Sequence, residues 1–383
     1  MASGRGAKGA GGRNLAQDPA ARPHEHGIAA PSHFGSVAFR PPPPAHAAST
    51  RVRRDWFCLQ TEVLLINCCQ RSDGGIAIKH PAFRGVYPAL TTPFRADLSL
   101  DADGFARLAD AVIGDGVHGI VVNGCTGESW SLTADERATV FRIAVEAARG
   151  RVPVVAGCSA QTAAEALSKI RAAADAGCAY AMVSPPWYII PGESEILEHY
   201  ERIIAGSPLP ILLYNIPRRT GVSLTLATID RLADDPKVVG IKESSKDWGL
   251  LSSVIRRTRD RISVFAGYAS FFGLAALCEG AVGYIDSGTP VFGEKSLAFY
   301  RAATTGDLDT ARRLQSDMEQ MLAAYFGLGT FPASIKAALD LLGRPGGPTR
   351  DPIRPLDAAQ RETLRKMMIG AGLIASAPRA RVA

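Results

Sequence analysis

A lysine at the end of an apolar run is the most informative chemical feature of this sequence. Residues 238–244 read VVGIKES, and Lys242 is the only amine among them. Lysine is rarely buried without a reason, and an amine removed from water has its pKa lowered towards the neutral, nucleophilic form. Schiff-base chemistry with a carbonyl compound requires that form. The alternative is a surface lysine that pairs with Glu243 or Asp247.

A tyrosine stands at a comparable position one structural unit earlier. Tyr214 opens residues 214–221, YNIPRRTG, and precedes Lys242 by 28 positions. If both residues end adjacent parallel strands, their side chains emerge at the same end of the sheet, where a phenol beside an imine would transfer protons. Taken singly, Tyr214 is typical of a half-buried wall residue, and Arg218 and Arg219 are typical of a solvated loop.

A glycine-bounded turn follows a third apolar run, at residues 119–123. The turn comprises Gly124, Cys125, Thr126 and Gly127. Glycine at both ends allows the backbone to turn sharply, and the N–H groups of the turn together with the Thr126 hydroxyl would hold a carboxylate. Read alone, the same residues also fit an ordinary tight turn.

The elements that must position these residues form a regular series of short apolar runs and helical patterns. The predicted strands are 85–90, 119–123, 153–157, 180–184, 210–215, 238–242, 264–267 and 282–286. The predicted helices between them include 105–113, 134–148, 163–176, 196–205, 224–233 and 250–258. Eight such units predict an α/β fold of the (β/α)8 TIM-barrel type, whose catalytic groups lie at the C-terminal ends of the strands. A doubly wound sheet is the second choice, because the chain has neither a GxGxxG after its first strand nor a P-loop.

Charge and composition set the first eighty residues apart. They hold 10 Lys/Arg and 5 Asp/Glu, whereas the remaining 303 residues hold 33 and 32, so the formal charge of +6 is mainly N-terminal. The nearly neutral remainder argues against nucleic acid as a partner and favours a small molecule.

No apolar stretch reaches the roughly 18 residues of a membrane helix. The Gly-, Pro- and Arg-rich N-terminal segment lacks apolar periodicity, which predicts disorder; a targeting segment and a later start codon near residue 75 are the alternatives.

We therefore expect four regions. They are a disordered basic extension or linker (1–80), the catalytic barrel (81–305), C-terminal helices that pack on it or contact another subunit (306–375), and a disordered tail (376–383). The seven cysteines include no CxxC and no Cys/His cluster, so we expect no metal site and no disulfide framework. A reducing, cytoplasmic location fits this cysteine usage.

Together the three motifs resemble those of the dihydrodipicolinate synthase / N-acetylneuraminate lyase family of pyruvate-dependent class I aldolases. The likeness rests on residues 124–128, 214–217 and 240–244, in the order and spacing of the family. It extends from about Arg84 to residues 348–352 and so covers most of the chain.

The resemblance implies a role for each motif. Lys242 would be the Schiff-base lysine for pyruvate or another 2-oxo acid, and Tyr214 the proton donor and acceptor. Thr126 and the turn formed by residues 124–127 would hold the carboxylate of the 2-oxo acid, with the backbone of Ile285 lining the opposite wall. No cofactor and no metal would be needed, because the imine nitrogen acts as the electron sink.

Other positions of the likeness concern the second substrate and the proton relay. Arg219 matches the arginine that contacts the carboxylate of the second substrate in synthases, and it favours 4-hydroxy-tetrahydrodipicolinate synthase activity. Tyr188, with the adjacent Trp187 as the alternative, resembles the aromatic that a neighbouring subunit contributes to the proton relay, which implies a homo-oligomer, a dimer or a tetramer. Cys125 stands where synthases have a second threonine of that relay, and residues 267–270 (GYAS) replace an acidic pattern.

The leading expectation is a lyase that joins a 2-oxo acid to an aldehyde or catalyses the reverse cleavage. A 2-oxo-3-deoxy sugar-acid aldolase or dehydratase is the alternative, because of Cys125 and residues 267–270. A non-catalytic sensor of 2-oxo acids is a third interpretation, although binding alone would require neither Lys242 nor Tyr214. A nucleic-acid-binding arm at residues 1–80 is disfavoured, because it lacks a dense basic cluster with interleaved aromatics.

Overall fold

The computed structural model describes residues 80–375, except for the side chains of residues 323–326. The predicted disorder of the N-terminal extension, up to residue 79, and of the tail at 376–383 therefore lies outside the described residues. None of the described helices is both long and apolar enough to cross a membrane.

Eight parallel strands form one sheet in which β2 to β8 follow one another in sequence order and β1 pairs with β8. The strands are β1 (Gly85–Val86), β2 (Ile120–Val122), β3 (Val154–Gly157), β4 (Tyr180–Val183), β5 (Ile211–Asn215), β6 (Val238–Glu243), β7 (Ser263–Ala266) and β8 (Gly283–Tyr284). Their order is β1-β8-β7-β6-β5-β4-β3-β2, and each of the eight falls within or overlaps a predicted run. The predicted (β/α)8 barrel is confirmed.

The extended segment that follows β1 closes the barrel. Regular strand structure ends at Val86, but the backbone N–H of Ala89 donates to the Asp286 carbonyl oxygen, and that of Leu90 donates to the Val121 carbonyl oxygen at 2.9 Å. A parallel bridge joins Ala89 to Val121 of β2. The chain at residues 87–90 thus bonds to both neighbouring strands and leaves no open edge at this point.

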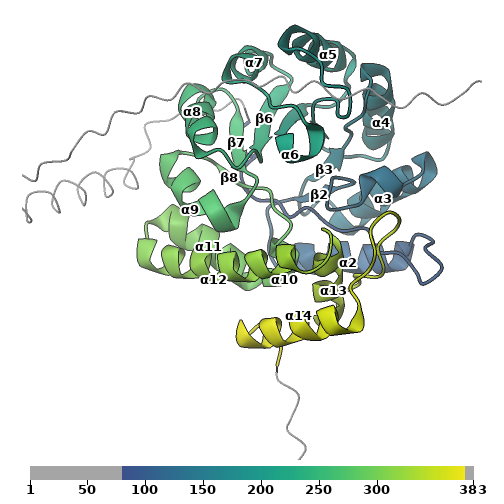
Figure 1. Cartoon of the computed structure of the whole chain (residues 1–383). Helices are drawn as coiled ribbons and strands as arrows, with labels where there is room; N and C mark the ends of the chain where they lie inside the picture. The colour runs from purple at the N-terminus through teal and green to yellow at the C-terminus, as the bar shows by residue number, and fades with distance from the viewer. Residues whose placement is uncertain (1–79, 376–383) are drawn as a thin grey trace, which may run out of the picture. The chain divides into compact units, whose positions relative to one another are not determined.

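Helices surround the strands, and further helices follow at the C-terminal end of the barrel sequence (Figure 1). They are α2 (Ala102–Gly114), α3 (Ala134–Ala148), α4 (Ala163–Asp175), α5 (Glu193–Gly206), α6 (Pro217–Thr220), α7 (Leu226–Leu232), α8 (Trp248–Thr258), α9 (Ala269–Glu279), α10 (Thr289–Phe292), α11 (Glu294–Thr305), α12 (Leu308–Gly327), α13 (Ala333–Leu341) and α14 (Ala358–Gly370), with a short 3-10 helix at Ser129–Ser131. The short helices α6 and α10 were not predicted, because four residues carry no readable periodicity.

Local capping explains where several helices begin. At α3 the Thr133 side chain accepts a hydrogen bond from the Glu136 backbone N–H, and the Glu136 carboxylate accepts one from the Thr133 N–H. This reciprocal arrangement satisfies donors that the first helical turn leaves unpaired. Asp101, Thr162 and Asp247 cap α2, α4 and α8 by the first of these bonds alone, each side chain accepting from a backbone N–H of the first turn.

Two apolar layers follow from the alternation of side chains along the strands. Inside the barrel lie Phe83, Tyr87, Ala89, Val121, Val155, Met182, Leu212, Tyr214, Ile216, Val239, Phe265, Val282 and Ile285. The alternate residues, such as Ile120, Ile211 and Val264, pack with the buried faces of the helices in a second cluster. The two-residue period of each strand thus separates the barrel interior from the helix layer.

Candidate active site

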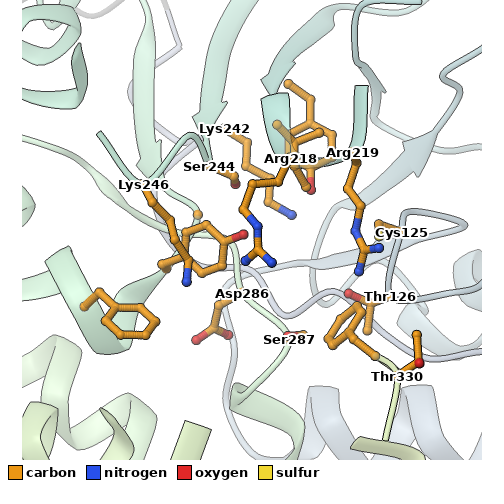
Figure 2. Close-up of a pocket in the computed structure, with 16 residues that line it drawn as sticks. Cys125, Thr126, Arg218, Arg219, Lys242, Ser244, Lys246, Asp286, Ser287 and Thr330 are labelled. Carbon is orange, nitrogen blue, oxygen red and sulfur yellow. The ribbon is translucent and has the colours of Figure 1, made fainter. Parts of the chain in front are cut away.

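A cavity of about 410 Å³ lies at the C-terminal ends of the strands and contains most of the predicted chemical groups (Figure 2). Its lining comprises Cys125, Thr126, Tyr214, Ile216, Arg218, Arg219, Lys242, Ser244, Lys246, Gly267, Tyr268, Phe271, Asp286, Ser287, Thr330 and Phe331. Residues more than 200 positions apart in the chain therefore meet in one pocket.

A bulge in β6 turns Lys242 towards the inside of the barrel. In a regular strand Lys242 would share the outward face of Val238, because side chains alternate. Pairing with β5 skips one residue of β6 between Val238 and Gly240, however. Beyond the skip, Ile241 packs in the helix layer and Lys242 pairs with Tyr214 of β5. The extra residue in the strand decides where the amine points.

The bulge depends on glycine at position 240. A Cβ atom there would lie 2.6 Å from the Ser263 carbonyl oxygen of β7 and 3.2 Å from Cδ1 of Leu212. A backbone oxygen fixed in a sheet cannot give way, so no side chain fits. Gly240 is thus a packing requirement located two residues before the candidate nucleophile.

The Lys242 amine is buried and has no carboxylate partner among residues 80–375 within salt-bridge distance. Its exposed fraction is 6%, and its Nζ lies 4.4 Å from the centre of the Tyr214 ring. Burial lowers the pKa of Lys242 to about 8, against the opposing charges of Cys125 and Asp286. A pKa near 8 leaves a substantial neutral fraction at physiological pH, which is the nucleophilic form. Pairing of Lys242 with Glu243 or Asp247, the alternative raised by the sequence, does not occur.

Tyr214 lies beside the amine as a neutral phenol. Burial holds the pKa of Tyr214 well above its ordinary value, and Cys125 and Tyr268 act in the same direction. A neutral phenol next to an amine can donate and accept a proton in turn. The adjacency of Tyr214 and Lys242 is fixed by their direct pairing in β5 and β6.

Buried polar contacts hold the ends of these two strands together. The Asn215 side-chain amide donates to the Glu243 carboxylate at 3.0 Å, and the same oxygen of Glu243 accepts from the Ser245 backbone N–H at 2.9 Å. The side-chain oxygen Oδ1 of Asn215 in turn accepts from the Leu224 backbone N–H at 3.0 Å. Glu243 is therefore a structural carboxylate, and it explains the Asn and Glu that follow Tyr214 and Lys242 in sequence.

The turn after β2 presents Cys125 and Thr126 to the cavity. Gly127 is confined, because a Cβ atom would lie 3.2 Å from both the Asn123 nitrogen and the Leu90 carbonyl oxygen. The Thr92 hydroxyl donates to the Gly127 carbonyl oxygen at 2.8 Å. Gly124 and Gly127 themselves do not line the cavity; they shape the turn that places the two polar side chains there.

Cationic and aromatic side chains gather around the outer part of the cavity. Arg218 and Arg219 extend into it from α6, and Lys246 from the loop after β6 (Figure 2). The Arg219 guanidinium lies 5.9 Å from the centre of the Phe331 ring. Lys246 Nζ is 4.9 Å from the centre of the Tyr268 ring. This part of the cavity suits an anionic ligand.

Asp286 adds a carboxylate at the end of β8. Its Oδ1 accepts hydrogen bonds from the Thr289 N–H at 3.1 Å and from the Thr289 hydroxyl at 2.8 Å. Burial raises the pKa of Asp286, and the charge of Lys242 opposes that rise. The preceding residue, Ile285, is fully buried in the barrel interior and does not line the cavity.

Tyr188 lies away from the cavity of its own chain. Its side chain is 90% exposed, and the neighbouring Ile189 and Ile190 are also exposed. Its backbone φ is +73°, which is unusual for a bulky residue and indicates strain.

Several cavity residues were not predicted from the sequence. Ser244 and Asp286 come at strand ends, so their position along the strands would have indicated them. Thr330 and Phe331 precede α13, in the region expected only to pack or to contact another subunit, and no local pattern distinguishes them.

Comparison with known proteins places this chain in a family. The model of the dihydrodipicolinate synthetase family matches residues 82–370, and the chain belongs to that family. It is therefore an enzyme of the aldolase type, a lyase or synthase.

Individual relatives agree with this placement. A 4-hydroxy-tetrahydrodipicolinate synthase of Methanoculleus marisnigri is 39% identical over 293 residues, which cover 76% of this chain and all of the relative. The crystal structure of the Cyanidioschyzon merolae dihydrodipicolinate synthase with lysine bound has a TM-score of 0.73 at 31% identity, over 76% of this chain and 99% of that one. The crystal structure of YagE, an E. coli K12 prophage protein of the family in complex with pyruvate, has a TM-score of 0.73 at 30% identity. The match covers 76% of this chain and 99% of that one.

Proposed function

We propose that the chain joins pyruvate, or another 2-oxo acid, to an aldehyde through an imine on Lys242, most like 4-hydroxy-tetrahydrodipicolinate synthase. The carrying observation is the buried Lys242 amine, which has a pKa of about 8 and lies 4.4 Å from the Tyr214 ring in the cavity that also holds Thr126 and Arg219. Similarity to synthases over three quarters of the chain supports the same reaction.

The first step uses the inner part of the cavity. The turn with Thr126 holds the carboxylate of the 2-oxo acid, which brings its keto carbon to the Lys242 nitrogen. The neutral amine adds to that carbon, and the former keto oxygen leaves as water once it has been protonated. Tyr214, whose ring centre lies 4.4 Å from Lys242 Nζ, supplies this proton.

The second step forms the new carbon–carbon bond. Loss of a proton from the carbon next to the imine gives an enamine, with the imine nitrogen accepting the electron pair. The enamine carbon attacks the aldehyde, whose oxygen takes up a proton. Hydrolysis of the resulting imine returns Lys242 as a free amine, so that atoms and protons balance over the cycle.

Arg219 indicates the kind of aldehyde. It lines the cavity and has no carboxylate partner within salt-bridge distance among residues 80–375. A guanidinium in this state binds a substrate carboxylate well, because it offers two parallel N–H donors. We therefore expect an aldehyde that carries a carboxylate, such as aspartate semialdehyde.

The second candidate function is that of a 2-oxo-3-deoxy sugar-acid aldolase or dehydratase. Tyr268 lines the cavity in the GYAS segment, and Cys125 lines it at the turn, so both departures from the synthase pattern face the ligand. Tyr268 adds a hydroxyl that would bind a polyol. The non-catalytic sensor is disfavoured by the lowered pKa of Lys242, which binding does not require.

We also propose that the enzyme acts as a homo-oligomer, a dimer or a tetramer. Tyr188, Ile189 and Ile190 form an exposed apolar loop after β4, with exposed fractions of 90%, 66% and 71%. Apolar patches of this kind mark protein contacts. Contact with a second copy would cover the loop and bring Tyr188 towards the Tyr214 of that copy.

Imine trapping tests the central claim. The protein is incubated with pyruvate and borohydride, and modified peptides are mapped by mass spectrometry. We expect a reduced three-carbon adduct on Lys242, and we expect Lys242→Ala to abolish both the adduct and turnover. Lys246, the other lysine of the cavity, is an internal control in the same digest.

Two results would contradict the proposal. One is an adduct on Lys246 or elsewhere that survives Lys242→Ala. The other is the absence of any adduct with each 2-oxo acid tried, together with turnover that borohydride leaves intact.

A further inference from the structure

A buried ion pair connects the carboxylate-binding turn to the C-terminal helices. Lys336 of α13 and Glu128, the residue after Gly127, have exposed fractions of 1% and 0%. Lys336 Nζ lies 2.7 Å from Glu128 Oε1. The two residues are 208 positions apart, and the sequence pattern links neither to the other.

The same amine reaches the turn by a second route. Lys336 Nζ donates to the Thr92 carbonyl oxygen at 2.8 Å, and the Thr92 hydroxyl donates to the Gly127 carbonyl oxygen at 2.8 Å. Lys336 Nζ also lies 4.3 Å from the centre of the Phe94 ring. One buried cation therefore contacts both the residue that follows the turn, Glu128, and Thr92, whose hydroxyl bonds to the turn at Gly127.

The other carboxylate oxygen of Glu128 is held by the same C-terminal region. The Arg350 backbone N–H donates to Glu128 Oε2 at 2.9 Å. Glu128 adopts a left-handed backbone conformation with a φ of +52°, which a glutamate does not favour by itself. Such a conformation persists when its surroundings fix it from several sides, as the two donors to the Glu128 carboxylate do here.

We propose that Lys336 is a positioning residue for substrate: through Glu128 and Thr92 it sets the turn that holds the 2-oxo acid carboxylate. The inference rests on the proposed function, because it takes the turn to be the carboxylate site. It assigns to α13 a part in binding the 2-oxo acid, beyond packing and subunit contact. Thr330 and Phe331, just before α13, line the outer part of the same cavity.

A purely structural role makes a different prediction. If the ion pair only stabilised the fold, its loss would weaken every ligand in proportion to the folded fraction. If it sets the turn, its loss weakens ligands that have a carboxylate and leaves those without one unaffected. The two cases separate when two carbonyl compounds of similar size are compared.

The experiment measures imine trapping at increasing concentrations of pyruvate and of hydroxyacetone, a ketone without a carboxylate. The variants are Lys336→Met and the double variant Glu128→Gln/Lys336→Met, which removes both charges and so avoids an unpaired buried carboxylate if the single variant does not fold. Lys336→Arg tests rescue by another cation. Circular dichroism establishes that each variant is folded.

Arg344→Met is the matched control. Arg344 belongs to the same C-terminal region and also bonds to the barrel, since its guanidinium makes two contacts with Asp115, at 2.7 and 2.8 Å. Both side chains are partly exposed, and neither lines the cavity. The variant removes a C-terminal contact of the same kind without touching the turn.

We expect the pyruvate concentration for half-maximal trapping to rise about tenfold in the folded double variant, because small displacements of a binding group have large effects. The corresponding concentration of hydroxyacetone should be unchanged, and Arg344→Met should alter neither concentration. The proposal is overturned if pyruvate stays within about twofold of wild type or if both ketones weaken equally. The proposal is also overturned if wild type traps pyruvate and hydroxyacetone at the same half-maximal concentration, because the carboxylate of pyruvate then contributes nothing to binding. Wild type that traps neither ketone would instead refute the proposed function, and this inference with it.

Discussion

Two buried lysines, one at the strand ends of the barrel and one in the C-terminal helices, have opposite surroundings. Lys242 has no carboxylate within salt-bridge distance among residues 80–375, and burial lowers its pKa to about 8. Lys336 is at least as deeply buried, but it pairs with Glu128 at 2.7 Å. Burial also lowers the pKa of Lys336, and Glu128 opposes that effect. The partner, not the burial, separates an amine suited to chemistry from one that holds structure.

Two arginines repeat the contrast. Arg219 extends into the cavity with its guanidinium 5.9 Å from the centre of the Phe331 ring, and it has no carboxylate partner within salt-bridge distance among residues 80–375. Arg350 stacks on Phe94 at 4.0 Å and binds the Glu136 carboxylate through both guanidinium nitrogens. Arg219 is thus left without an acidic partner where a substrate is to bind, whereas Arg350 is paired where the C-terminal region joins the barrel.

The same substitution at the two lysines should have opposite effects on stability. Lys336→Met leaves Glu128 buried without its cation, so the free energy of unfolding should fall by about 3–5 kcal/mol. Lys242→Met removes an amine whose charge burial disfavours, so stability at pH 7 should rise by about 1–3 kcal/mol while turnover is lost. Urea denaturation of both variants measures the difference. Destabilisation of similar size in both variants would contradict the contrast drawn between the two lysines.

The pH dependence of that stability difference has a definite sign. The pKa of Lys242 is lower in the folded protein, so its penalty is fully present below pH 8 and disappears as the pH rises towards 10.5, the ordinary value. The advantage of Lys242→Met over wild type should therefore shrink above pH 8.

The two arginines should differ in which property they change. Arg219→Ala should raise the KM for the carboxylate-bearing aldehyde by an amount equivalent to about 1.5–3 kcal/mol, because a charge-assisted contact is lost. The variant Arg219→Ala should keep the melting temperature of wild type and should still form the imine with pyruvate. Arg350→Ala should lower the melting temperature, because the Glu136 pair is lost. Steady-state kinetics and thermal melting measure both, and unaltered aldehyde kinetics in Arg219→Ala would argue for the sugar-acid alternative.

A smaller effect is expected from pH on imine formation. Below pH 8 the neutral fraction of Lys242 changes about tenfold per pH unit, so the trapping rate at subsaturating pyruvate should rise by about that factor from pH 6 to 7. Above pH 8 the rate should level off. A flat profile from pH 6 to 9 would mean that the reacting amine has another pKa or that a different step limits the rate.

The smallest effect should come from the N-terminal region. We propose the predicted boundary near residue 80, because the closing contacts of β1 with β8 and of Ala89 with Val121 lie entirely within the barrel. A chain that begins at Ile76 should keep its activity and melt within about 1 °C of the full chain. Removal of residues 358–375 is the comparison, and it should cost stability because Leu364 and Met368 are fully buried. A loss of several degrees on removing residues 1–75 would contradict the boundary.

The sequence indicated the candidate site to the extent that its residues lie at strand ends. Tyr214, Lys242 and the turn with Thr126 each follow an apolar run, and a barrel collects such ends at one place. Thr330 and Phe331 follow no such run, and they reach the cavity only because the chain returns over the barrel after α12. Tyr188 carries no signal of its exposure, since neighbouring apolar residues normally indicate burial.

What the sequence determined by itself is the series of eight strands, the helix faces and the types of residue at each strand end. These follow from short-range periodicity, which a linear pattern records directly. Tertiary structure alone decided the direction of the Lys242 side chain, because the bulge before Gly240 reverses the alternation that the pattern of β6 would give. It also decided that Lys336 is the partner of Glu128 across 208 positions. Both depend on where neighbouring segments lie in space, and the free energy of such contacts leaves no periodic trace in the chain.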